Sequence, residues 1–179
     1  MQVDRLTSLI DDLLDVTRIQ AGKLSLSFEM FDVSALVKDV VESYSEHLAS
    51  AACTFSVKTE GTFIIRADRY RLEQAIVNLL LNAPKYGAGK PVEFSVSCED
   101  KKVKIICRDY GIGIPPAKLD KIFERFERAV TSKNVSGLGL GLYITRQIIE
   151  AHGGSVRVES VLGEGATFSV ELPILQDGR

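Results

Sequence analysis

Residues 103–115 read VKIICRDYGIGIP, an apolar run that ends at a carboxylate, Asp109, and two closely spaced glycines. Valine and isoleucine favour an extended backbone, so the run up to Cys107 predicts a strand. Gly111 and Gly113 then allow a sharp turn and a close backbone approach, because glycine carries no Cβ. The stretch predicts a strand and a loop that can lie against a flat ligand, although a tight turn without any ligand also fits it.

A second cluster precedes this strand at residues 78–86, which read NLLLNAPKY near the end of a helix predicted over 69–86. Asn78 and Asn82 are four residues apart, so their amides lie on one face of that helix. An amide oxygen is a suitable ligand for Mg²⁺, and Lys85 can place a positive charge near a phosphate. Two asparagines on a helix are, taken alone, also typical of a plain polar surface.

A third cluster, SGLGLGL at residues 136–142, opens a helix predicted over 138–151. Glycines at a helix start leave backbone N–H groups accessible, and such groups form a binding site for phosphate. The pattern is neither GxxxxGK[ST] nor a GxGxxG that follows a strand, which argues against a Walker loop and against dinucleotide binding. Together the clusters fit one nucleotide, because Asp109 can also accept a hydrogen bond from an exocyclic amine such as that of adenine.

The remaining periodicities predict an α+β fold, a two-layer α/β sandwich with helices on one face of a sheet. Helices are expected at 3–20, after a cap at Asp32 or Ser34, at 69–86, near 116–124 and at 138–151. Strands are expected at 24–30, 53–58, 62–66, 91–98, 102–108, 154–160 and 165–172. The polar stretch 127–136 lacks apolar periodicity, so we expect it to be poorly ordered without nucleotide.

The composition is that of a globular domain with a small appendage. Of 179 residues, 45% are hydrophobic and 26% charged, and the net charge is −2, which disfavours a nucleic-acid or anionic-membrane partner. No apolar run approaches the roughly 18 residues that a membrane span needs. The cysteines Cys53, Cys98 and Cys107 form no CxxC pair, which indicates free thiols in a reducing compartment, the cytoplasm.

In this order the clusters resemble the N, G1, F and G2 boxes of sensor histidine kinases. The boxes correspond to 78–86, DYGIGI at 109–114, FERF at 123–126 and GLGLGL at 137–142. The similarity covers nearly the whole chain, including Asp68 before the N-box helix. It implies the Bergerat ATP-binding fold of the GHKL superfamily, with ATP and Mg²⁺ as cofactors.

The resemblance also implies individual roles within the boxes. Asn82 would coordinate Mg²⁺ with Asn78 beside it, and Asp109 would accept a hydrogen bond from the adenine amine. Lys85 and Tyr86 would face the phosphates and the ribose. The base would be lined by Gly111, Gly113 and Ile114, and the phosphates would be wrapped by Gly137, Leu138, Gly139, Leu140 and Gly141.

Residues 115–136 would form an ATP lid, anchored by Phe123 and Phe126. Arg128 would supply a cation to the terminal phosphate and would act in catalysis with Asn82 and Lys85. Pro84 departs from a regular N-box helix, since it removes an N–H and disfavours helical geometry before it, so we expect the helix to bend or end early.

The acceptor histidine of the family is missing from the chain. Neither His47, in a helix of the sandwich, nor His152, at a helix end where a cation would suit the dipole, matches its motif. Residues 1–22 resemble the last part of the second helix of the dimerisation hairpin, 23–175 the catalytic domain, and 176–179 a tail. The acceptor helix and any membrane anchor are therefore expected upstream.

The resemblance further implies partners and competing functions. A response regulator would receive the phosphoryl group, and the upstream hairpin would form a homodimer, while this chain itself would contact neither nucleic acid nor membrane. The alternatives are an ATPase of the chaperone, topoisomerase or mismatch-repair type, a serine kinase of the anti-sigma type, and a degenerate kinase that serves as an interaction module.

The absence of an acceptor motif predicts that the chain binds ATP without labelling itself. Incubation with γ-labelled ATP should leave the 179-residue chain unlabelled. Addition of the upstream hairpin should restore labelling with an acid-labile phosphate. Stoichiometric label at His47 or His152 in the chain alone would contradict the assignment.

Overall fold

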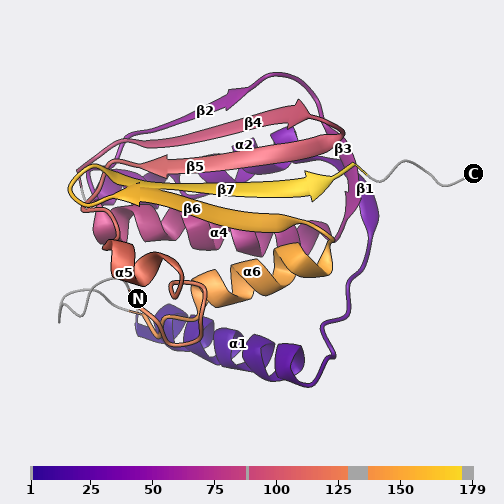
Figure 1. Ribbon diagram of the computed structural model, residues 1–179, viewed down its shortest axis with the longest axis horizontal. Helices are drawn as coiled ribbons and strands as arrows, with labels where there is room; N and C mark the ends of the chain where they lie inside the picture. The colour runs from indigo at the N-terminus through magenta and orange to yellow at the C-terminus, as the bar shows by residue number, and fades with distance from the viewer. Residues whose placement is uncertain (1, 88, 129–136, 175–179) are drawn as a thin grey trace, which may run out of the picture.

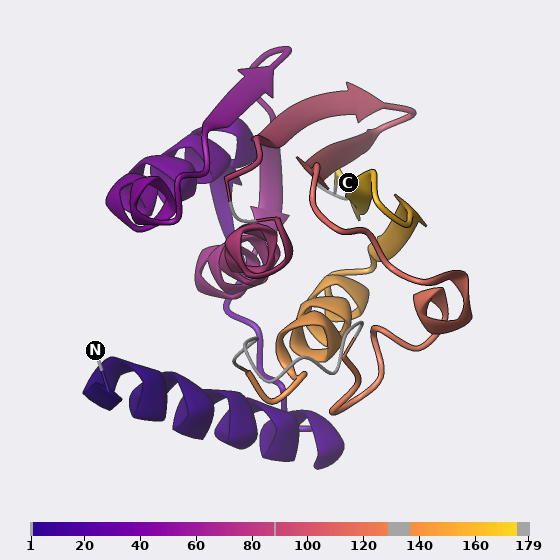
Figure 2. The same cartoon turned by 90° about the vertical axis from the view of Figure 1, so that its left-hand side faces the viewer.

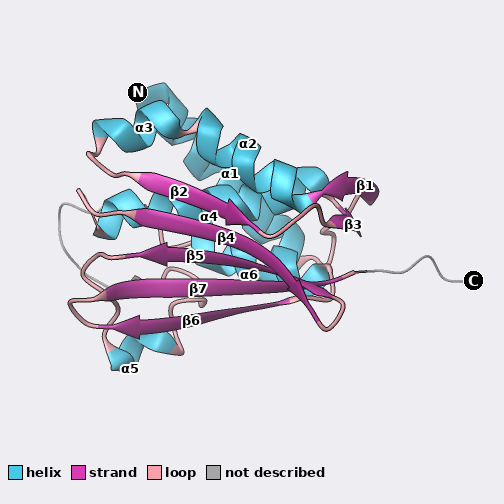
Figure 3. Ribbon diagram, turned by 90° about the horizontal axis from the view of Figure 1, so that it is seen from above, coloured by secondary structure: helices cyan, strands magenta, loops and turns pink. Residues whose placement is uncertain are grey.

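The architecture is a five-stranded sheet covered on one face by helices (Figures 1 and 3). The structure is a computed structural model, and it describes residues 2–87, 89–128 and 137–174. The sheet has the order β2-β4-β5-β7-β6, in which β2 and β4 are parallel and the other neighbours antiparallel. Its strands are β2 (Phe55–Thr59), β4 (Val92–Glu99), β5 (Lys102–Asp109), β7 (Gly165–Pro173) and β6 (Ser155–Val161). The predicted two-layer sandwich is confirmed.

A separate two-stranded antiparallel sheet pairs β1 (Glu29–Asp32) with β3 (Ile64–Ala67). Helices α2, α4 and α6 lie against the large sheet, and α1 lies outside them (Figure 2). The helices are α1 (Gln2–Gln20), α2 (Val33–Ser43), α3 (Ser45–Ser50), α4 (Arg69–Tyr86), α5 (Pro116–Leu119) and α6 (Gly141–Ala151). No helix in the described ranges combines the length and apolarity that a membrane crossing requires.

Helix α4 is the central helix of the covering layer. Asp68 caps its first turn, because its Oδ1 accepts the N–H of Arg71 at 3.0 Å. The residues that it buries recur at helical spacing: Leu72, Ala75, Ile76, Leu79, Leu80 and Ala83. Strands β4 and β5 meet them with alternating buried side chains such as Phe94 and Ile105, each 1% exposed. One continuous core therefore fixes α4 against the sheet.

The expectation that the helix ends early at Pro84 is wrong, and the alternative of a bend there stays a prediction. Helix α4 continues to Tyr86, and the N–H of Gly87 still donates to the carbonyl of Ala83 at 2.7 Å. Proline forfeits only its own N–H, so the next turn closes around it where the helix is held by the core. Lys85 and Tyr86 are therefore placed by the last turn of α4.

The strand expected at 24–30 is also mostly wrong, because only Glu29 and Met30 of that range belong to β1. Leu24 and Leu26 are half-buried and Ser25 and Ser27 exposed, as the alternation predicted. The segment lacks a neighbouring strand, since the pairing with β3 starts at Glu29. The N–H of Ser27 instead donates to Oδ2 of Asp68 at 2.8 Å. Side-chain alternation alone therefore could not show whether a ladder forms.

His152 has a structural role at the end of α6. Its Nε2 accepts the backbone N–H of Asp68 at 3.0 Å, so this nitrogen carries no proton. Nδ1 then donates to the carbonyl of Ile148 at 2.7 Å. The neutral ring ties the C-terminus of α6 to the N-terminus of α4. The predicted disorder at 127–136 falls almost wholly on residues outside the described ranges.

Candidate nucleotide-binding site

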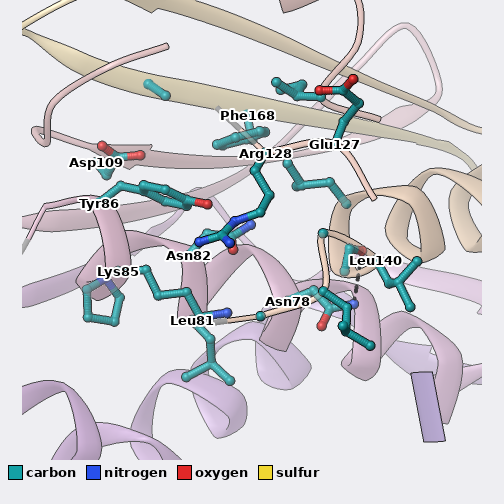
Figure 4. A pocket seen from close by; sticks show the side chains of 18 of the residues that line it. Asn78, Leu81, Asn82, Lys85, Tyr86, Asp109, Glu127, Arg128, Leu140 and Phe168 are labelled. Atoms are coloured by element: carbon teal, nitrogen blue, oxygen red, sulfur yellow. Dashed lines mark hydrogen bonds between the residues drawn. The ribbon is translucent and has the colours of Figure 1, made fainter. Parts of the chain in front are cut away.

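A cavity of about 660 Å³ lies between the C-terminal half of α4, the end of β5 and the glycine-rich start of α6 (Figure 4). Its walls contain most of the residues that the sequence predicted for a nucleotide. These are Asn78, Asn82, Lys85, Tyr86, Asp109, Gly113, Ile114, Arg128, Gly137, Leu138, Gly139, Leu140 and Gly141. Segments separated by up to 63 residues in sequence thus converge on one space large enough for a cofactor.

The α4 wall connects the asparagine cluster to the glycine cluster. The side-chain nitrogen of Asn78 donates to the backbone carbonyl of Gly141, the first residue of α6, at 3.2 Å (Figure 4). A Cβ on Gly141 would lie 3.4 Å from the Asn78 side chain, so glycine lets the two helices approach. Asn78 therefore positions the start of α6, while Asn82, one turn further on, presents its amide to the cavity.

Asp109 closes the other side of the cavity at the end of β5. It is only 8% exposed, because β5 is flanked by β4 and β7 at this register. Its Oδ1 accepts the N–H of Gly111 at 2.9 Å. Burial raises the pKa of Asp109 above the usual aspartate range, and the backbone N–H groups of Gly111 and Ala166 oppose that shift. The site thus holds a poorly hydrated carboxylate that the backbone fixes in orientation.

The glycines of the loop after Asp109 are required by packing. A Cβ on Gly111 would clash with the carbonyl oxygen of Tyr86, which accepts the N–H of Ile112 at 3.0 Å. A Cβ on Gly113, whose φ is +70°, would clash with the carbonyl of Val161. Gly113 lines the cavity, and Gly111 packs against the end of α4. Glycine at position 111 is therefore required by this packing, and its predicted contact with the base stays a prediction.

The two phenylalanines of the F box have different environments. Phe123 is 8% exposed and packs edge-on against Phe168, with ring centroids 6.5 Å apart, so it supports a cavity residue from behind. Phe126 is 60% exposed, and its side chain does not reach the cavity wall. Its backbone N–H donates to the carbonyl of Gly139 at 3.0 Å. Its φ of 63° turns the chain at that point, and the anchoring role of its side chain stays a prediction.

Three groups with basic or phenolic character gather on one side of the cavity. Arg128 hydrogen-bonds Tyr86, and Figure 4 shows its side chain directed toward Tyr86 and Asn82. Burial raises the pKa of Tyr86, and Arg128 opposes this. Lys85 keeps an accessible side chain, yet burial of its surroundings lowers its pKa, which Asp12 raises and Arg128 lowers further. Two cationic side chains therefore lie close together in the wall of the cavity.

Several cavity residues were not identified from the sequence. Leu9 and Asp12 come from α1, Tyr44 and His47 from the region of α3, and Phe168 from β7. The spacing of Leu9 and Asp12 places them on one helix face, but nothing local showed which surface that face covers. His47 lies at the wall, although its surroundings in sequence do not match an acceptor motif. No group of metal-binding side chains of the His, Cys, Asp and Glu type occurs among the described residues.

Residues 67–176 match the family model for "Histidine kinase-, DNA gyrase B-, and HSP90-like ATPase". The chain belongs to this family. It is 34% identical over 176 residues to the circadian input-output histidine kinase CikA of Synechococcus elongatus, an alignment that covers 95% of the chain and 23% of CikA. The chain thus spans about a quarter of the length of that relative.

Solved structures of histidine kinases share the fold. Full-length ShkA in complex with AMPPNP superposes with a TM-score of 0.85 at 31% identity, over 98% of this chain and 37% of that one. ThkA in complex with the response regulator protein TrrA gives a TM-score of 0.78 at 26% identity, over 99% and 50%. Family membership and these relatives confirm the predicted ATP-binding domain of the histidine kinase type.

The raised pKa of Asp109 and the lowered pKa of Lys85 predict an acid limit and an alkaline limit, the pH values beyond which nucleotide binding weakens. The Asp109 carboxylate accepts a hydrogen bond best when ionised, so affinity for adenosine should fall on acidification at a higher pH than for an ordinary aspartate. Lys85 attracts phosphate only while protonated. Its lowered pKa means that affinity for ADP should fall on alkalinisation at a lower pH than for an ordinary lysine.

Calorimetric titrations over a pH series check both limits. Adenosine isolates the acid limit, because it carries no phosphate that titrates. Asp109→Asn should abolish the acid limit and leave the alkaline limit in place. An acid limit of unchanged position in this variant would contradict the assignment.

Proposed function

We propose that the chain binds Mg·ATP in this cavity and supplies the catalytic half of a protein histidine kinase. In the whole protein the γ-phosphoryl group would pass to a histidine outside this chain and then to an aspartate of a response regulator. The observation that carries the proposal is the charge arrangement of the cavity: the buried carboxylate of Asp109 and, separately, the cations Lys85 and Arg128.

Asp109 supports recognition of the base. A carboxylate that the N–H of Gly111 holds at 2.9 Å presents acceptor capacity toward the cavity, and an adenine amine is a donor of matching chemistry. Ile114 and Phe168 supply apolar walls beside it, which suit a flat aromatic ring. A guanine would place a carbonyl where adenine has the amine, and two acceptors would then oppose each other.

The other wall supports recognition of the phosphates. Backbone N–H groups in the glycine-rich segment 137–141 lie at the start of α6, where the helix dipole favours an anion. Nζ of Lys85 lies 3.9 Å from the position of a Cβ on Gly137, so its charge belongs to the same phosphate region. Figure 4 shows the Arg128 side chain beside Tyr86 and Asn82, and its charge lowers the pKa of Lys85 in the same cavity.

The residues present fit Mg²⁺ held mainly by the nucleotide. Mg²⁺ keeps several waters and takes one or two protein oxygens together with phosphate oxygens. The amide oxygen of Asn82 in the cavity wall would be such a ligand, and a cluster of carboxylates would not be needed to hold the ion. When bound, the ion neutralises charge on the phosphates. Asn82, Lys85 and Arg128 then orient the triphosphate for in-line transfer, in which positioning supplies most of the rate.

The partners follow from the relatives and are proposals for this chain. The structure of ThkA contains a response regulator protein, which supports a regulator as the final phosphoryl acceptor here. A homodimer would form through the hairpin to which α1 belongs. A chain that turned over ATP steadily without any acceptor histidine would instead support an ATPase of the same family.

Substitution of the two polar anchors tests the site. Asp109→Asn should weaken Mg·ADP and Mg·ATP binding by about 1.5–3 kcal/mol, roughly tenfold or more, because a charge-assisted hydrogen bond is lost. Asn82→Ala should weaken the Mg²⁺ complexes but leave adenosine binding unchanged. Calorimetry measures both, with Glu99→Gln at an exposed position of β4 as the matched control. Wild-type affinity in Asp109→Asn would refute the site.

A further inference from the structure

Helix α4 presents one outward stripe that serves both α1 and the cavity. The stripe recurs every three or four residues, as Arg71, Gln74, Asn78, Leu81 and Lys85. The first two members bond to α1, and the last three line the cavity. The residues that contact α1 and the residues that line the cavity therefore lie on the same continuous helix. Helix α4 thus links the position of α1 to the nucleotide site.

Asp15 fastens α1 to this stripe through a buried polar cluster. Its Oδ1 accepts from Nη1 of Arg71 at 2.8 Å, and its Oδ2 accepts from Nε2 of Gln74 at 2.7 Å. Nη1 of Arg71 also donates to Oε1 of Gln74 at 2.9 Å, which closes the cluster. The side chains of Asp15 and Arg71 are only 8% and 11% exposed. Both carboxylate oxygens are satisfied, so the geometry of the contact is well defined.

The same attachment places Asp12 in the wall of the cavity. Val16 is 6% exposed and Ile19 packs on the core, so α1 is seated along the face that continues through Asp12 to Leu9. Figures 1 and 2 show α1 alongside α6, whose N-terminus begins at the cavity. A helix outside the family domain of residues 67–176 thus contributes an anion to the site.

Asp12 and Lys85 both line the cavity, and each lies within electrostatic reach of the other. Burial raises the pKa of Asp12 most, Asp15 adds to the rise, Lys85 opposes it, and Asp11 raises it slightly further. In return, Asp12 raises the pKa of Lys85 against the lowering by burial. Each group therefore responds to the charge of the other inside a partly desolvated cavity, where Coulomb interactions are stronger than in water.

We propose that Asp12 is a specificity-determining residue of the nucleotide site. Its carboxylate, which the docking of α1 holds near Lys85, competes with nucleotide phosphates for interaction with the charge of Lys85. This inference rests on the proposed function. The phosphates of a bound nucleotide replace Asp12 as the partner of Lys85 and repel its carboxylate. The loss of affinity that Asp12 causes therefore grows from adenosine to ADP to ATP. By linkage, ATP loosens the docking of α1, and undocking of α1 raises the affinity for ATP by the same factor.

Neutralisation of Asp12 tests the proposal directly. Adenosine, ADP and ATP are titrated calorimetrically with and without Mg²⁺. Asp12→Asn should raise the affinity for ATP about threefold to tenfold, that for ADP less, and that for adenosine not at all. Asp11→Asn, which removes the charge of the exposed neighbour, is the control and should change none of them.

The possible outcomes separate the two claims. Equal ATP affinity of Asp12→Asn and the wild type would overturn the inference alone. A loss of affinity confined to Mg²⁺ conditions would also overturn it, because Asp12 would then be a metal ligand. If the wild type bound none of the three ligands, the proposed function and this inference would fall together.

The buried cluster gives a second, independent test. Asp15→Asn should free α1 and raise the affinity for ATP without affecting adenosine. Combined with Asp12→Asn, it should add nothing further, because the competing charge is already absent. Circular dichroism verifies that Asp15→Asn and the double variant fold. A rise that is equal for adenosine and ATP, or full additivity in the double variant, would refute the role of Asp12.

Discussion

The buried carboxylate of Asp109 is the constraint on which the site depends. With 8% exposure it cannot rely on water, so the backbone must supply donors, and the N–H groups of Gly111 and Ala166 do so. That requirement draws the loop after β5 close to the ends of α4 and β7. Gly165 illustrates the closeness, because a Cβ there would clash with the carbonyl of Asp109. Glycines are therefore needed in this region because the backbone packs closely around the desolvated carboxylate of Asp109.

Helix α4 connects the site to the core, to α1 and to α6. Its apolar face is fixed by the core, and its polar face carries the amides, the lysine and the contacts with α1. Asn78 extends the link to α6 through the carbonyl of Gly141, and the neutral ring of His152 ties the far end of α6 back to the N-terminus of α4. A shift of either helix would thus change the cavity. This geometry explains how a helix at the edge of the domain can influence nucleotide binding.

The sequence predicted the parts of the structure that depend on local spacing. The amides of Asn78 and Asn82, the end of the strand at Asp109 and the glycines before α6 follow from periodicity and from the backbone demands of turns. The errors arose where distant partners decide. The segment at 24–30 had the alternation of a strand but no neighbour, and Pro84 was tolerated because the core holds the helix around it. Asp12 reaches the site because Asp15 bonds Arg71, 56 residues away, which no local pattern shows.

The proposed nucleotide site depends most on Asp109 as the acceptor for adenine, with the phosphates at the start of α6. A crystal structure of the chain with Mg²⁺ and AMPPNP tests this arrangement directly. The adenine amine is predicted to lie about 2.7–3.2 Å from a carboxylate oxygen of Asp109, with the phosphates beside Lys85 and the N–H groups of residues 137–141. A nucleotide bound with its base away from Asp109, or with its phosphates at that carboxylate, would contradict the account.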